Sequence, residues 1–238
     1  MDTLIRRGIT KELGVLPALS GLAQHMQKSG AGIYCAGIWA DDLARGLMWC
    51  PPFASVYGRI VPYRAPSWSW ASVKMEEHMP DIYNFIRNLR TKTCQMLCAV
   101  LETQCIFSGK DPLGAVSSGY LILSSPLLEA RHPLPENARS SGWLRSFELG
   151  ELGFWELQGV RLENNYFGST LEFIIQLDIP PSTLTQAGAF HSLILGRYGV
   201  KDIEYFGIAL ELKDKGSSPN TFARVGWFKI SNKDATLL

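Results

Sequence analysis

The chain has 238 residues, of which 46% are hydrophobic and 19% charged, and its formal net charge is +1 at pH 7. This composition excludes a disordered protein and supplies enough apolar side chains for a substantial core. The small net charge gives no electrostatic reason to expect nucleic acid or a membrane surface as a partner. No apolar run reaches the ~18 residues of a transmembrane helix. We expect a single domain over residues 1–238, with a helical front segment (1–60) and a β-rich body (61–238).

The five cysteines are an odd number and are scattered along the chain, at Cys35, Cys50, Cys94, Cys98 and Cys105. This usage is typical of reduced, buried thiols and not of a disulfide framework. The first twenty residues carry Arg6, Arg7, Lys11 and Glu12 without a following apolar core, so we expect no secretory signal. Both observations favour a cytoplasmic protein.

Two helical stretches are predicted in the front segment. From Pro17, apolar residues recur at helical spacing until Gly30, and proline is well suited to a first helical turn. A second, short helix is expected after Asp41 or Asp42, either of which would cap it.

Residues 63–73, Tyr-Arg-Ala-Pro-Ser-Trp-Ser-Trp-Ala-Ser-Val, carry the most distinctive pattern. In an extended chain Trp68 and Trp70 point to one face and the intervening serines to the other. An indole buries about 150–250 Å² when covered, so this face needs a partner. The pattern predicts a tryptophan strand, beginning after Pro66, on which the helical and β-rich parts both pack.

From Cys94 onward, apolar runs alternate with clusters of turn residues. The predicted strands cover residues 95–107, 119–124, 154–162, 171–177, 190–195, 205–212 and 223–230. This spacing indicates an α+β, mainly β fold: a short N-terminal helical segment packed on an antiparallel β-barrel or sandwich of about seven to eight strands.

Several segments together resemble a known family. They read Leu-Pro-Ala-Leu-Ser-Gly-Leu-Ala (16–23), Cys-Ala-Gly-Ile-Trp (35–39), Asp-Leu-Ala-Arg-Gly-Leu-Met-Trp (42–49), the 63–73 stretch, Asp-Pro-Leu-Gly-Ala-Val-Ser-Ser-Gly-Tyr-Leu-Ile-Leu (111–123) and Phe-Ala-Arg-Val-Gly-Trp-Phe (222–228). In this order they resemble the region that follows the HET (heterokaryon incompatibility) domain in large fungal proteins. In those proteins the HET domain, which resembles a nucleotide-cleaving TIR-like module, comes first; here we expect it to be absent. The resemblance implies a fungal origin, an approximate fold and a missing partner domain, but supplies no catalytic residues.

The acid–base candidates are few. Glu76, Glu77, His78 and Asp81 form the densest ionisable cluster, just after the predicted tryptophan strand. His78 would act as a general base oriented by Asp81 if this segment covered a barrel mouth; a solvated charged loop is the alternative. His191 lies within a predicted strand and is either a catalytic group that points inward or a hydrogen-bonded core histidine.

The substrate-binding candidates are aromatic residues and one arginine. Trp39, Trp49, Trp68 and Trp70 would line an aromatic pocket, or would simply pack in the core. Arg64 is expected either to clamp the helical front to the β body, through a carboxylate such as that of Asp41 or Asp42, or to anchor a ligand carboxylate.

No phosphate-binding loop, nucleophile elbow or paired metal-ligand spacing occurs, so no cofactor and no metal are expected. Cys94 and Cys98 would share one face of a strand as core thiols or, on weak spacing, bind a metal.

Two functions remain open. The first is a cofactor-free cyclase or isomerase of fungal secondary metabolism that folds a small apolar molecule in a barrel-like container, where positioning alone contributes about 7–11 kcal/mol. The second is a non-catalytic recognition or regulatory module of a HET protein, which acts with a separate HET-domain partner. A homo-oligomer is compatible with either.

Overall fold

The computed structural model describes residues 12–49, 58–74, 94–131, 143–144, 155–157, 160–162, 171–179, 189–199, 204–214 and 221–232. Its helices are α2 (Val15–Lys28) and α3 (Leu43–Gly46), with short 3-10 helices at Glu12–Gly14, Ala40–Asp42 and Trp70–Ser72. Its strands are β1 (Tyr34–Cys35), β2 (Ile38–Trp39), β3 (Cys94–Met96), β4 (Ala99–Phe107), β5 (Val116–Ser124), β6 (Leu127–Arg131), β7 (Trp143–Leu144), β8 (Trp155–Leu157), β9 (Val160–Leu162), β10 (Leu171–Leu177), β11 (Ala189–Tyr198), β12 (Glu204–Asp214) and β13 (Thr221–Asn232).

The predicted fold class is confirmed, because a short N-terminal helical segment is followed by antiparallel sheets. The largest sheet has seven strands in the order β3-β11-β12-β13-β10-β7, with β6 pairing against β11. Three two-stranded sheets, β1-β2, β4-β5 and β8-β9, complete the described strands. The described strand order does not close on itself, so a sandwich-like packing fits better than a barrel.

Helix α2 begins two residues before Pro17, which therefore sits in the first turn as predicted. Its buried face comprises Leu16, Leu19 and Ala23, spaced three and four residues apart. Gly30 ends the segment with a φ of +92°, a left-handed conformation that glycine adopts without strain. Pro17 and Gly30 in the sequence thus correctly mark the two ends of helix α2.

The predicted tryptophan strand is wrong. Residues 67–69 form a turn that leads into the 3-10 helix Trp70–Ser72, and only Val73 makes a β-bridge, to Arg59. The reason lies in Ser69, which the strand prediction places on the face opposite the two tryptophans. The side chain of Ser69 accepts a hydrogen bond from the backbone N–H of Ala71 at 3.0 Å and so caps the 3-10 helix.

Two predicted strands are each divided in the structure. Residues 154–162 contain the hairpin strands β8 and β9, and residues 95–107 contain most of β3 and all of β4. The second break occurs where the N–H groups of Leu97 and Cys98 both donate to the carbonyl of Leu195, at 2.9 and 3.2 Å. The chain crosses from the large sheet to the β4-β5 hairpin at this point.

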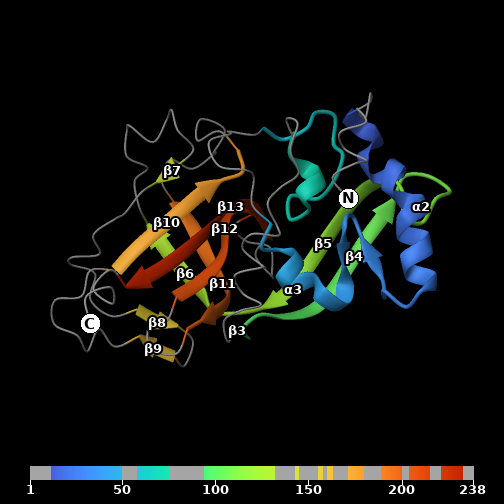
Figure 1. The fold of residues 1–238 in the computed structure, drawn as a ribbon. Coiled ribbons are helices and arrows are strands. Elements are labelled where there is room, and N and C mark those ends of the chain that lie inside the picture. The colour runs from blue at the N-terminus through green and yellow to red at the C-terminus, as the bar shows by residue number, and fades with distance from the viewer. Residues whose placement is uncertain are drawn as a thin grey trace.

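One core cluster joins the parts of the molecule. It contains buried side chains from α2, the β1-β2 hairpin, α3, the tryptophan segment (residues 63–73), β11 and β12, with the inner face of β4-β5 packed against it. Figure 1 shows α2 and β4-β5 at one side of the molecule and the orange and red strands of the large sheet at the other. No helix in the described ranges is long and apolar enough to cross a membrane.

Candidate functional site

The tryptophan segment both accepts and donates hydrogen bonds that hold it against neighbouring parts of the chain. Trp49 Nε1 donates to the carbonyl of Trp68 at 2.8 Å, and Trp70 Nε1 donates to the carbonyl of Gly37 at 2.9 Å. The hydroxyl of Ser69 donates to the carbonyl of Ala36 at 2.5 Å. Trp49, Trp68 and Trp70 are all buried in the main core cluster. Their predicted role in binding a substrate stays a prediction.

Trp39 lies apart from those three indoles. It is half-buried and packs edge-on against Tyr34, with ring centroids 5.1 Å apart, beside a small cluster that includes Ala23 and Leu113. Burial raises the pKa of Tyr34 to about 12. The structure therefore brings three of the four predicted pocket tryptophans into one cluster and places the fourth in another.

Arg64 stabilises its own segment. The side chain is buried and donates to the carbonyls of Ala71 and Val73, the latter at 2.7 Å. One of the two carboxylates predicted to hold it, Asp42, instead pairs with Arg45 at the surface, at 3.0 Å. Asp42 also occupies the predicted N-cap of α3, but its side chain makes no capping hydrogen bond.

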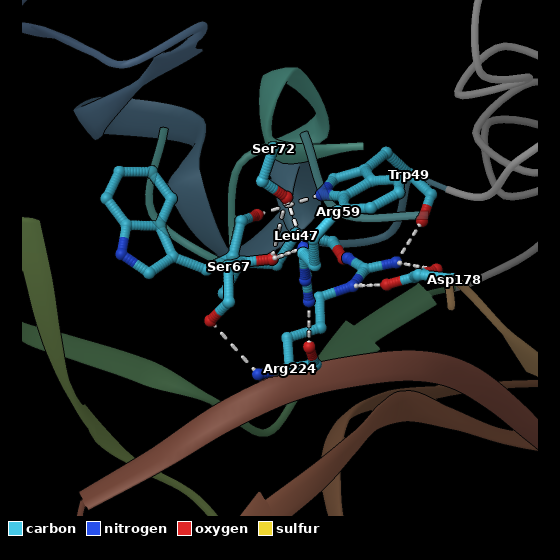
Figure 2. A network of polar contacts seen from close by, with 8 residues as sticks. Leu47, Trp49, Arg59, Ser67, Ser72, Asp178 and Arg224 are labelled. Carbon is cyan, nitrogen blue, oxygen red and sulfur yellow. Dashed lines mark hydrogen bonds and ion pairs between the residues drawn. The ribbon is translucent and has the colours of Figure 1, made fainter. Parts of the chain in front are cut away.

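The clamp between the front segment and the large sheet is built on Arg224, as Figure 2 shows. This side chain rises from β13, and its Nε lies 2.8 Å from Asp178 Oδ2; both side chains are fully buried. The guanidinium also donates to the carbonyls of Leu47 and Trp49, and its central carbon lies 3.5 Å from the centre of the Trp49 ring. Arg224 thus satisfies backbone acceptors of α3's C-terminal end from a strand of the sheet.

Arg59 extends this network toward the tryptophan segment (Figure 2). We call the network formed by Arg224, Asp178, Arg59 and the carbonyls of Leu47 and Trp49 the clasp. It donates to the carbonyl of Ser67 at 3.2 Å, to the hydroxyl of Ser72 and to the carbonyl of Arg224. Burial lowers the pKa of Arg59 to about 10; the charge of Arg224 acts in the same direction, whereas Asp178 and Glu211 oppose it. The guanidinium remains a cation at neutral pH.

Sequence reasoning missed the clasp. Arg224 lies in the quoted 222–228 motif, and Asp178 directly follows the predicted strand 171–177. The available signal was an arginine in a mainly apolar strand and an aspartate at the end of another, because buried charges require partners. The two residues are 46 positions apart, so spacing alone could not pair them.

His191 is the one predicted acid–base residue in the described part of the chain; Glu76, Glu77, His78 and Asp81 lie outside it. It is half-buried on β11, and its ring packs edge-on against Phe222 with centroids 5.0 Å apart. Register places His191, Leu210 and Arg224 in one row across β11, β12 and β13, so their side chains share a face.

Three buried polar atoms have no hydrogen-bond partner within the described residues: Nδ1 of His191, Nε1 of Trp68 and Oγ of Ser192. Buried polar atoms are normally paired, so such atoms can mark a site for a small polar group. His191 and Ser192 are adjacent on one strand and therefore point to opposite faces. At most one of these two side chains can therefore face the tryptophan segment, to which Trp68 itself belongs. The described residues hold no cluster of three or more His, Cys, Asp or Glu that could bind a metal.

The outer face of β4-β5 carries exposed apolar side chains beside the exposed polar residues Glu102 and Gln104. Ile106 is 53% exposed and Tyr120 is 43% exposed. Tyr120 pairs with Gln104, two residues from Ile106, so the two side chains share this face. Leu101, 66% exposed, sits at the bulge in β4. The Tyr120 hydroxyl bonds to Glu102, which fixes the phenol on the strand surface and raises its pKa.

Comparisons of this chain with protein-family models, curated protein sequences and solved structures give no significant match.

Proposed function

We propose that this chain is a non-catalytic recognition module of a fungal incompatibility system, and that it binds a HET-type domain through the outer face of β4-β5. The proposed setting is the cytoplasm, which agrees with the free thiols of the four cysteines in the described ranges. The proposal depends on one contrast. Most of the inner aromatic side chains and Arg64 are used in packing and hydrogen bonds within the fold, whereas apolar side chains on the outer face of β4-β5 are exposed.

On the inside, three of the five side chains expected to bind a substrate make hydrogen bonds within the fold. The indole N–H groups of Trp49 and Trp70 donate to backbone carbonyls, and so does the guanidinium of Arg64. The face of the Trp49 ring is covered by Arg224. A ligand would have to displace these buried contacts, each of which contributes about 0.5–1.5 kcal/mol net and more when charged.

On the outside, Leu101, Ile106 and Tyr120 are held on a rigid hairpin whose inner face packs on the core. Exposed apolar side chains gathered on one surface are typical of a binding site for a protein. Tyrosine anchors such a site well because it buries a large area at small entropic cost. The resemblance supplies the identity of the occupant, since in the similar fungal proteins a HET domain precedes these motifs.

A second candidate is the small-molecule enzyme, the cofactor-free cyclase or isomerase acting on an apolar substrate. The unpartnered Nδ1 of His191 and Nε1 of Trp68 favour it, because a substrate oxygen would satisfy either atom. His78 and Asp81 remain candidates for its acid–base chemistry.

The test is isothermal titration of the full chain with a purified HET domain encoded by the same genome. We expect Ile106→Glu and Tyr120→Glu each to weaken binding by at least tenfold, because a charge would be buried against an apolar partner surface. Leu127→Glu is the matched control: Leu127 is 38% exposed on β6 of the other sheet, and this variant should bind like the wild type.

Three outcomes would overturn the proposal: no binding of the HET domain, equal binding by all three variants, or burial of the hairpin face in a homo-oligomer. Turnover of an apolar substrate that is lost in His191→Ala, with the fold intact, would establish the enzyme instead.

A further inference from the structure

Two free thiols from distant parts of the sequence meet between the β1-β2 and β4-β5 hairpins. Cys35 ends β1 and is buried, whereas Cys105 is half-buried on the inner face of β4. Their side chains are hydrogen-bonded to each other. Thr103, two residues before Cys105 and on the same face of β4, donates from Oγ1 to Cys35 Sγ at 3.6 Å. The strand therefore presents a hydroxyl and a thiol to one sulfur atom.

Both thiols are held by rigid surroundings. The turn after Cys35 has left-handed residues, Ala36 (φ +43°) and Gly37 (φ +98°), whose carbonyls accept hydrogen bonds from the tryptophan segment. Cys105 pairs with Gly119 on β5, where an added Cβ would lie 3.4 Å from the Cys105 sulfur and 2.8 Å from Pro66 Cγ. Glycine at this position leaves room for the thiol.

The hydrogen bonds also decide which thiol ionises first. Donation from Cys105, and to a smaller extent from Thr103, lowers the pKa of Cys35, and burial only partly opposes this effect. The same hydrogen bond, with burial, raises the pKa of Cys105. Cys35 is thus the nucleophilic thiolate and Cys105 the neutral resolving thiol, the arrangement expected of a redox-sensitive pair.

We propose that Cys35 and Cys105 form a reversible disulfide, with hydrogen peroxide as oxidant. The Cys35 thiolate attacks one peroxide oxygen; the S–O bond forms, the O–O bond breaks, and the departing hydroxide takes a proton to become water. The sulfur of Cys105 then attacks the sulfenic acid; the S–S bond forms, the S–O bond breaks, and the second hydroxide leaves as water with the Cys105 proton. Two thiols are oxidised and one peroxide is reduced to two waters.

The bond would tie the front hairpin to the hairpin that carries the proposed binding face. It would close a loop from residue 35 to residue 105, so oxidation should raise the midpoint of thermal unfolding by about 5–10 °C. Cys35 is 4% exposed, so a small oxidant should act much faster than glutathione disulfide. This inference is independent of the proposed function, because neither the bond nor its test involves a partner.

The test treats the full chain with hydrogen peroxide, blocks the remaining thiols with N-ethylmaleimide and digests with trypsin and Glu-C. Cleavage after Glu102 releases Cys105 on the peptide 103–110, free of Cys94 and Cys98, and Cys35 lies on the peptide 29–45. We expect mass spectrometry to find these two peptides cross-linked, and dithiothreitol to separate them. The rate of cross-linking should rise with pH as the Cys35 thiolate forms, and its midpoint should lie below the pKa of an ordinary thiol, because the hydrogen bond from Cys105 lowers the pKa of Cys35.

Matched variants complete the test. Cys94→Ser should cross-link like the wild type, since Cys94 lies on β3, and Cys105→Ser should leave Cys35 over-oxidised without a cross-link. The wild-type peptide map alone decides the case if a variant fails to fold. Absence of the 29–45/103–110 cross-link, a Cys94–Cys98 bond in its place, or an unchanged unfolding midpoint after oxidation would overturn the inference.

Discussion

Arg224→Met is expected to lower the free energy of unfolding by about 3–5 kcal/mol, because it leaves the carboxylate of Asp178 buried without its cation. The carbonyls of Leu47 and Trp49 also lose a donor, and an unsatisfied buried acceptor costs about 1–3 kcal/mol. The loss should therefore lie at or above the upper end of that range.

A double-mutant cycle separates these contributions. Asp178→Leu combined with Arg224→Met removes both charges, so the double variant should be more stable than the sum of the single losses predicts, by about 2 kcal/mol or more. Urea unfolding followed by fluorescence gives each value. Arg45→Met is the control: its pair with Asp42 is more than half exposed, and the expected loss is about 0.2–1 kcal/mol. Equal midpoints for Arg224→Met and Arg45→Met, or additive losses in the cycle, would refute the clasp.

Three further effects follow from local geometry. Gly37→Ala should lower the free energy of unfolding by about 1–3 kcal/mol, because φ is +98° and the new Cβ would lie 2.7 Å from Trp70 Nε1. Its control is Gly21→Ala in helix α2, where an added Cβ meets nothing within 4 Å; this variant should raise the free energy of unfolding by about 0.5–1 kcal/mol in the same urea assay. Trp70→Phe should cost about 1–2 kcal/mol more than Trp68→Phe, since only the Trp70 indole N–H has a hydrogen-bond partner to lose; equal losses would contradict this. Burial raises the pKa of the Tyr34 phenol to about 12, so this group ionises at lower pH in the unfolded chain than in the folded one. The free energy of unfolding should therefore fall by up to about 2–3 kcal/mol between pH 10 and 12, and Tyr34→Phe should reduce this fall.

Local patterns in the sequence were sufficient for much of the fold. Pro17 and Gly30 marked helix α2 because proline and glycine each restrict the backbone in a known way. The strand 171–177 was predicted with the bounds that β10 has, and those of β11, β12 and β13 were predicted only slightly short. Turn residues on both sides delimit such strands without any tertiary information.

The tryptophan segment shows where local patterns fail. Alternation of tryptophan and serine predicts a strand, but a serine can cap a helical turn equally well, and the choice depends on acceptors elsewhere, such as the carbonyls of Ala36 and Gly37. The clasp is still harder to predict from the sequence, because the contact between Arg224 and Trp49 joins the large sheet to the front segment and exists only in the folded protein. Side chains that pair at long sequence separation cannot be recognised from the spacing of residues along the chain.

Hydrogen–deuterium exchange of the full chain, alone and with the HET domain, is the most direct test of a binding surface on the β4-β5 hairpin. We expect slower exchange in β4 and β5 on binding and unchanged exchange in β12 and β13, whose core contacts are already made. Protection confined to the large sheet, or no protection at all, would contradict a recognition surface on the β4-β5 hairpin.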